Sequence, residues 1–373
     1  MLKLLSSVRI TVVCLFLLFV LIFWGTVAQV QQGLYVAQER FFNSFFFLAD
    51  GFLPFPGAQL VLWVLFVNLL AMTITRFSTY RKWSYAGVLI VHFGLLLYFA
   101  AAFIVFQVSR ESNVHLTEGE ATNVSTSYIQ WELAYWTGPD GTIGAGESQH
   151  HQVTAVDTND FKPGYEIPFV NKDFALKVKQ FYPNSDAFSS SEKRSPRILN
   201  ASGISLLTPK PLLKERGQNI AGGIFDVQFK SHDYTLILFG TESQATAVTI
   251  GDKVYHFSLR HKRYLLPFTI KLDHFKVEFH PGTDMAKSYE SLVTLSTGAL
   301  QRQVRIFMNN PLRYKDYTLY QASYDVDSVG RQYTTLAVVK NFARLLPYVA
   351  CFIVFFGLAL HFLTQAFLVK EET

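Results

Sequence analysis

Residues 86–106 read AGVLIVHFGLLLYFAAAFIVF, an apolar stretch without a single Asp, Glu, Lys or Arg. A helix needs roughly 20 mainly apolar residues to cross the hydrocarbon core of a bilayer, and this stretch is long enough. The sequence therefore predicts a membrane-spanning helix here. His92 lies inside it, where an ionisable side chain is costly and is a functional candidate by default.

Apolar residues are concentrated near both ends of the chain. Half of the 373 residues are hydrophobic, 16% are charged and 35 are Phe. Four stretches have the length and composition of spans: 10–28, 59–74, 86–106 and 345–367. The first resembles a signal peptide, but its apolar run is too long and no cleavage site follows, so we expect a retained anchor. The predicted fold class is an integral membrane protein with four transmembrane helices and a mainly antiparallel β extracytoplasmic domain.

The short connections between spans predict the orientation, because Lys and Arg accumulate on the cytoplasmic side. Basic residues precede the first span, lie between the second and third spans, and follow the fourth: Lys3, Arg9, Arg76, Arg81, Lys82 and Lys370. Only Arg40 lies between the first two spans. We therefore expect cytoplasmic termini, a membrane domain over 1–107, an extracytoplasmic domain over 108–344, and a last span with its tail over 345–373. The net charge of +5 follows this pattern and does not indicate nucleic-acid binding.

The central region has the short alternating apolar and polar runs that are typical of β-strands. The clearest predicted strands are 175–181, 235–239, 247–250, 275–279, 291–295 and 303–308. A Pro-Phe pair leading into a strand and a Pro-containing turn occurs at 168–186 and again at 267–284, which suggests a duplicated β unit. The Ser- and charge-rich stretch 189–197 predicts an exposed loop.

Signatures of common enzymes are missing from the central region, which therefore resembles a binding or docking module. The only cysteines, Cys14 and Cys351, lie in predicted spans at different depths, so we expect neither a disulfide nor thiol exchange. The adjacent His150 and His151 predict a solvated loop. Structural roles are expected for the other histidines in or beside strands: His115, His232, His256, His261 and His274.

Two histidines lie within predicted spans. His92 and His361 each fall on the order of 10 Å inside the inner boundary, at a rise of 1.5 Å per residue. A neutral imidazole among Phe and Leu side chains suits an axial ligand of haem iron, and Gly94 and Gly357 would admit a macrocycle or a neighbouring helix. A hydrogen-bonded structural role is the alternative, above all for His361. Asn68 is expected to form interhelical hydrogen bonds.

One segment resembles a known family. Residues 309–324, NNPLRYKDYTLYQASY, are similar to the "N-x-P-L-x-Y-x-x-Y-x-x-Y-Q-x-S-Y" block of the ResB (CcsB) component of system II cytochrome c biogenesis. The HPGT turn at 280–283, followed by Tyr289-x-Ser291, the LLSSVR opening at 4–9 and the LPFPG loop at 53–57 resemble further family blocks. The family topology also has three spans, a large outer domain and a last span.

The resemblance implies a role in haem delivery. ResB-type proteins work with a CcsA-type, Trp-rich, multi-span partner that helps export haem b and attach it to apocytochrome c. In the family, the third-span histidine ligates haem, and His92 occupies that place. The opposite ligand is usually a partner histidine, which leaves His361 in doubt. The resemblance thus implies a non-autonomous subunit in the plasma (inner) membrane that is not an enzyme on its own, with a thiol reductase as a further candidate partner.

Two other functions stay open at the level of sequence. The chain could be a membrane b-type cytochrome that transfers electrons through a haem held by both His92 and His361. It could also be a scaffold without haem whose outer domain docks apocytochrome c.

Overall fold

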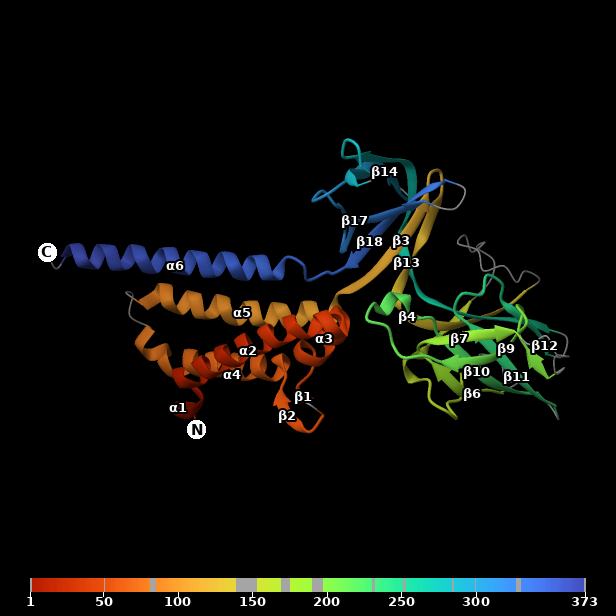
Figure 1. Cartoon of the computed structure of the whole chain (residues 1–373). Helices are drawn as coiled ribbons and strands as arrows, with labels where there is room; N and C mark the ends of the chain where they lie inside the picture. The colour runs from red at the N-terminus through yellow and green to blue at the C-terminus, as the bar shows by residue number, and fades with distance from the viewer. Residues whose placement is uncertain are drawn as a thin grey trace. The chain divides into compact units, whose positions relative to one another are not determined.

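The computed structural model contains helices near both ends of the chain and β-strands between them (Figure 1). It describes residues 2–49, 51–80, 85–138, 153–168, 175–189, 197–229, 232–250, 253–283, 285–298, 300–326 and 330–371. These residues form two compact units. The first comprises Met1–Arg110, Tyr314–Tyr317 and Lys340–Thr373, and the second comprises Glu111–Arg313 and Thr318–Val339.

The first unit is built on four helices long and apolar enough to cross a membrane. They are α2 (Val8–Gln32), α4 (Ala58–Tyr80), α5 (Ala86–Val108) and α6 (Leu346–Glu371). The four predicted spans are therefore confirmed as helices, each somewhat longer than its apolar stretch. Helix α2 begins at the N-cap Ser7, whose hydroxyl accepts from the Arg9 amide, and it ends at Gly33, whose φ of +82° favours glycine.

Short elements connect α2 to α4. They are α3 (Leu34–Ala37), the π-helix η1 (Gln38–Phe42) and a hairpin of β1 (Phe46–Ala49) and β2 (Leu53–Pro56), and α1 (Leu2–Leu5) precedes α2. One face of the hairpin packs on α2, where the rings of Phe47 and Phe55 each lie 5.6 Å from the ring of Trp24. Sequence analysis did not predict this hairpin, whose strands have four residues each and are shorter than the commonest strand length of about 5–6 residues.

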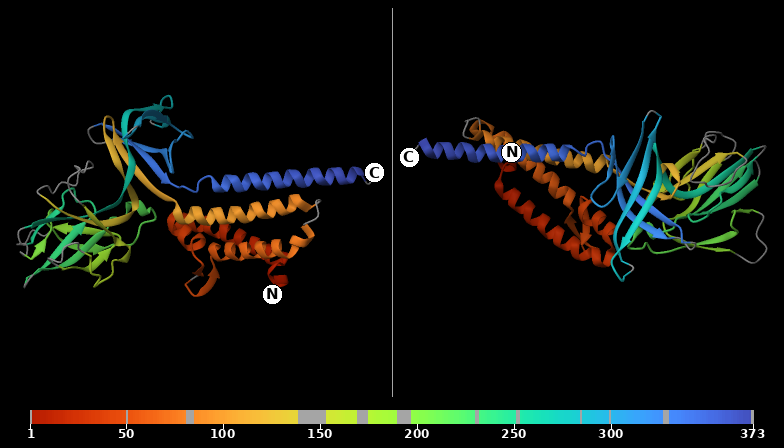
Figure 2. Two further views of the ribbon diagram at one scale, coloured as in Figure 1. Left: turned by 180° about the vertical axis from the view of Figure 1, so that it is seen from behind. Right: turned by 90° about the horizontal axis from the view of Figure 1, so that it is seen from above.

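The second unit is almost entirely antiparallel β-sheet, as predicted (Figure 2). Its ten-stranded sheet has the order β15-β14-β13-β4-β3-β18-β17-β16, with β12 and β5 paired to β13 and β4. The bounds are β3 (Arg110–Thr117), β4 (Ala121–Thr137), β5 (Thr154–Asp157), β12 (Thr246–Ile250), β13 (Lys253–Phe279), β14 (Ala286–Thr297), β15 (Leu300–Ile306), β16 (Leu312–Tyr314), β17 (Tyr317–Val326) and β18 (Gln332–Lys340).

A second sheet has the order β6-β10-β11-β8, and β7 pairs with β9 in a separate ribbon. The bounds are β6 (Ala175–Tyr182), β7 (Ser185–Ser189), β8 (Ile198–Leu199), β9 (Ile204–Pro209), β10 (Gly222–Phe229) and β11 (His232–Phe239). The core lies between this sheet and the β4–β13 part of the larger one. It contains four fully buried side chains: Leu133, Phe225, Leu236 and Phe257. Burial of such side chains is the main stabilising term for this sandwich.

All six predicted strands are confirmed, several as parts of longer strands. Strand β15 ends at Ile306, before the predicted end, because Phe307 and Asn310 form a tight turn in which Asn309 has φ +61°. The suggested duplication differs from the pairing observed: β13 and β14 pair with each other, whereas β6 pairs with β10 and β7 pairs with β9. Most of the predicted loop 189–197 lies outside the described residues.

Candidate functional site

Helices α5 and α6 lie side by side along their length in both views of the molecule (Figures 1 and 2). Glycines set how closely they approach. A Cβ placed on Gly87 would lie 2.5 Å from the backbone nitrogen of His361, one on Gly357 would lie 2.8 Å from the Val91 nitrogen, and one on Gly94 would lie 2.8 Å from the Val354 side chain. The two helices are therefore in backbone contact. Helices within a bilayer often pack in this way at small residues, because lipid is itself apolar and the hydrophobic effect does not drive them together.

His92 lies on α5 within this helix pair and is half-buried. Its Nδ1 is 2.8 Å from the carbonyl oxygen of Val88, four residues earlier in the same helix. A carbonyl can only accept a hydrogen bond, so Nδ1 carries a proton and donates it, and in a neutral imidazole Nε2 then carries the lone pair. A metal-binding imidazole is usually oriented by a backbone carbonyl, a carboxylate or a water that accepts from its other ring nitrogen. The neighbouring Phe93 is 58% exposed.

His361 lies on α6 in a different environment. Its backbone nitrogen faces Gly87, its carbonyl accepts from the Thr364 hydroxyl at 2.9 Å, and its ring lies 5.7 Å from that of Phe362. Its Nδ1 is buried, and among the described residues it has no hydrogen-bond partner. Nothing described on α6 thus fixes the tautomer of His361 as Val88 fixes that of His92.

The two histidines do not lie at one level. His361 is opposite Gly87, and His92 is five residues further along α5, an offset of about 7.5 Å. This offset follows from the glycine contacts, which set a register between α5 and α6 that the boundaries of the apolar stretches do not reveal. Gly94 and Gly357 admit a neighbouring helix, and that helix fills the space between the two backbones.

Asn68 on α4 has the interhelical role predicted for it. Its side chain is 2% exposed, and its Nδ2 donates to the carbonyls of Leu5 and Ser7 at 2.5 and 3.1 Å. Its Oδ1 accepts from the hydroxyl of Thr11 at 2.7 Å. Asn68 thus ties the start of the chain to α4, and these contacts account for a polar side chain inside a span.

The histidines of the second unit with expected structural roles lie on β-strands. His256 and His261 on β13 stand directly opposite Trp136 and Trp131 on β4, and each ring is stacked on its tryptophan. His115 bonds the Thr335 hydroxyl at 2.9 Å. Burial lowers the pKa of His261, and the charge of His115 lowers it further.

His274 lies 2.8 Å from Glu118, the side chain of His232 is not described, and His150 and His151 lie outside the described residues. No group of three or more metal-binding side chains occurs within the described ranges.

Parts of the two clearest family-like segments meet in the second unit. Ser291 is fully buried, and its hydroxyl donates to Gln321 at 2.7 Å and lies 3.0 Å from the hydroxyl of Thr334. The Tyr289 hydroxyl donates to the carbonyl of Ala322 at 3.1 Å. The segments at 280–291 and 309–324 therefore form one hydrogen-bonded cluster on β14, β17 and β18, a relation that sequence spacing did not indicate.

Sequence analysis missed two features of the helix pair. Gly87 lies seven residues before Gly94 and hence on the same helical face, so that this spacing could have identified the contact. The orienting oxygen of His92 belongs to a backbone carbonyl, which every residue carries, and no sequence signal could have found it.

Comparison with known proteins supports the motif analysis. Residues 219–330 match the ResB-like family. A stretch of 95 residues, 25% of this chain, is 33% identical to Protein NrfI of Wolinella succinogenes and covers 10% of that protein. The matched region contains Ser291 and Gln321, whose side chains are hydrogen-bonded, and it ends four residues before their shared partner Thr334. The predicted resemblance is therefore confirmed: residues 219–330 of this chain are ResB-like.

Proposed function

We propose that this chain is a non-autonomous membrane subunit of the system II cytochrome c maturation machinery. It holds haem within the membrane and helps a CcsA-type partner export the haem and attach it to apocytochrome c. The ResB-like region and the similarity to NrfI support a role in cytochrome c biogenesis. Four helices long and apolar enough to cross a membrane support a membrane location for the protein.

The hydrogen bond between His92 Nδ1 and the Val88 carbonyl carries the haem proposal. This hydrogen bond favours the tautomer whose Nε2 can bind iron. Both of its partners lie on α5, so it does not depend on another helix. Exposed apolar side chains such as Phe93 provide the surface against which a porphyrin would pack. Haem is cargo in this proposal, and the role of His92 is to hold it until it is passed on.

The second axial ligand in this proposal comes from the partner. A haem ligated by both His92 and His361 would require space between α5 and α6, and the contact of Gly87 with the His361 backbone leaves none at that level. This packing disfavours the electron carrier with an in-chain pair of histidine ligands. In the proposed topology both termini are cytoplasmic, and the second unit lies on the outer side of the plasma (inner) membrane to dock apocytochrome c.

The test is the absorption spectrum of the chain purified with its partner. Haem should co-purify with the complex, and His92→Ala should lose it unless imidazole is supplied. His361→Ala is the matched control and should keep haem. Unchanged haem content in His92→Ala would end the ligand proposal and favour the scaffold without haem. Six-coordinate haem in the isolated chain, lost in either variant, would favour the electron carrier.

A further inference from the structure

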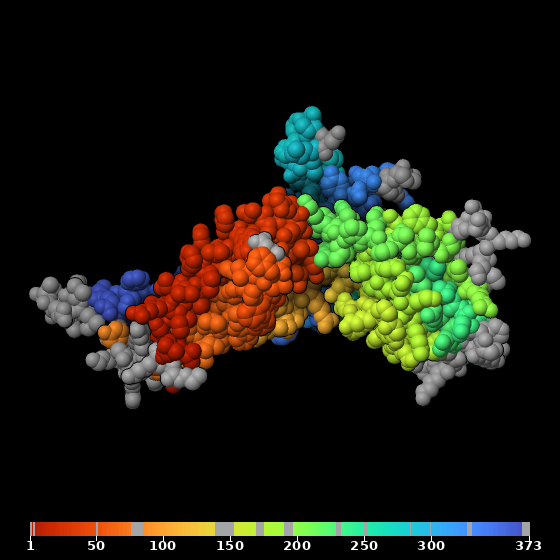
Figure 3. Space-filling model, turned by 60° about the horizontal axis from the view of Figure 1, so that its bottom comes forward, coloured from red at the N-terminus to blue at the C-terminus, as the bar shows by residue number. Residues whose placement is uncertain are grey.

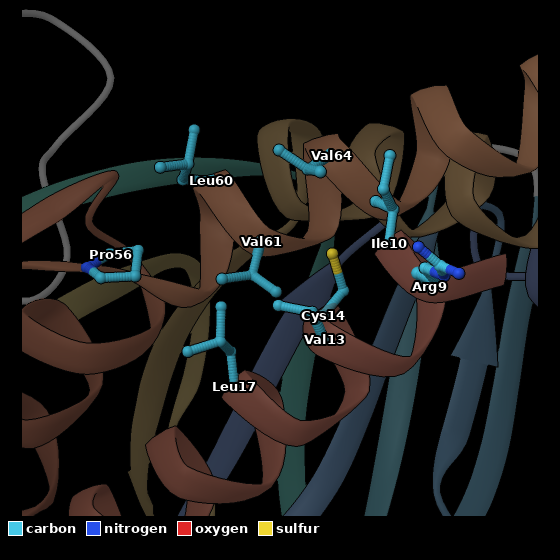
Figure 4. A pocket seen from close by; sticks show the side chains of 9 residues that line it. All are labelled: Arg9, Ile10, Val13, Cys14, Leu17, Pro56, Leu60, Val61 and Val64. Carbon is cyan, nitrogen blue, oxygen red and sulfur yellow. The ribbon is translucent and has the colours of Figure 1, made fainter. Parts of the chain in front are cut away.

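An apolar groove of about 320 Å³ lies in the first unit between α2 and α4 (Figure 4). Side chains from both helices line it, with Pro56 beside the start of α4: Arg9, Ile10, Val13, Cys14, Leu17, Pro56, Leu60, Val61 and Val64. Figure 3 shows the side chains of the two helices, red and orange, beside each other on one face of the molecule. Arg9 is the only charged side chain in this lining.

The groove is open on one side. Its floor is formed by Cys14 and Val61, which are 4% and 3% exposed, and its rims include Val13 and Val64, which are 57% and 41% exposed. Both helices have the length and hydropathy of membrane spans, so this open side would face hydrocarbon. An aliphatic chain fits such a lining, because the walls offer only dispersion contacts.

Charge complementarity identifies the other end of the occupant. Arg9 lies in the first turn of α2, is exposed, and forms no ion pair with a described carboxylate. The amino end of a helix carries a partial positive charge and also favours anions. A guanidinium and a helix start at one end of an apolar groove match a phosphate group attached to an acyl chain.

We propose that this groove binds one anionic phospholipid, with an acyl chain between α2 and α4 and its phosphate at Arg9. The site rests on the four helices lying in a bilayer and does not depend on haem binding. Arg9 precedes the predicted first span on its cytoplasmic side, so the lipid belongs to the inner leaflet.

The headgroup is tested by native mass spectrometry of the full chain from nanodiscs. The discs contain equal amounts of phosphatidylglycerol and phosphatidylcholine with identical acyl chains. One basic side chain near a membrane surface favours an anionic lipid about fivefold. Wild type should therefore retain one lipid, and that lipid should be phosphatidylglycerol about five times as often as phosphatidylcholine. Arg9→Gln should abolish the preference, and Arg9→Lys should keep most of it. Equal retention of both lipids by wild type would overturn the assignment.

The groove itself is tested by filling it. Val64→Trp places a large ring on the rim, and it should reduce retained lipid of either headgroup. Val67→Trp is the matched control, because Val67 is on the same helix, is 42% exposed and does not line the groove. Equal lipid retention by these two variants would overturn the proposal that the groove binds the lipid. The haem spectrum of both variants should equal that of wild type, which separates this proposal from the fate of His92.

Discussion

Gly87 on α5 faces the backbone of His361 on α6 so closely that a Cβ on the glycine would lie 2.5 Å from the His361 nitrogen. The nearest atoms are backbone atoms of α6, which cannot move aside as the end of a flexible side chain can. A methyl group at position 87 would therefore push the two helices apart. Gly87→Ala should therefore lower stability by about 1–3 kcal/mol, the usual cost of overpacking. The midpoint of thermal denaturation in detergent would measure this loss.

Gly298→Ala is the control for that experiment, because a Cβ at Gly298 meets nothing within 4 Å and the position carries no positive φ. It should leave the midpoint unchanged. Equal midpoints for both variants would show that α5 and α6 are not in backbone contact.

Asn68 should contribute measurable stability to the first unit. Asn68→Leu removes three hydrogen bonds and leaves the carbonyls of Leu5 and Ser7 without this donor. Interhelical hydrogen bonds in membranes average about 0.6 kcal/mol, so the loss should be about 1–2 kcal/mol. Limited proteolysis should also release the N-terminal residues earlier. Thr73→Ala, whose hydroxyl donates within its own helix to Leu69, should do neither.

The buried ion pair between Glu132 and Arg260 should be sensitive to the loss of one partner. Their side chains are 4% and 11% exposed and lie 2.9 Å apart. Arg260→Ala would strand a buried carboxylate at a cost of about 3–5 kcal/mol, whereas replacing both residues by Leu and Met should recover much of the loss. Urea denaturation followed by the β-sheet circular dichroism signal measures both. Removing the exposed pair of Lys276 and Glu278 should have no measurable effect.

The second unit should lose stability as the pH falls below 6.5. Burial lowers the pKa of His261 in the folded chain, so the unfolded chain binds a proton first. Stability rises with pH wherever the unfolded state binds more protons, and the contribution of His261 is therefore lost between pH 6.5 and its lowered pKa.

His261→Phe keeps a ring against Trp131 and removes the titrating group. The urea midpoint of wild type should fall over this pH range, and that of the variant should fall less. Identical pH profiles for the two proteins would exclude His261 as a source of the acid sensitivity.

Composition and local pattern were enough to predict the four helices and the β character of the central region. About 20 apolar residues predict a helix able to span a bilayer, because a single segment satisfies all its own backbone hydrogen bonds in hydrocarbon only as a helix. An apolar period of two predicts a strand with one buried face. The interhelical role of Asn68 and the ResB-like blocks within residues 219–330 were also predictable, because each depends on residue type and local spacing.

Which of these residues meet depends on how the elements pack, and local sequence does not reveal it. The register of α5 against α6 depends on glycine contacts between segments far apart in sequence, and that register offsets His92 from His361. The Val88 carbonyl that orients His92 is backbone and leaves no mark in the sequence. The cluster of Ser291, Gln321 and Thr334 likewise joins three strands through side-chain geometry, which becomes defined only when the sheet has formed.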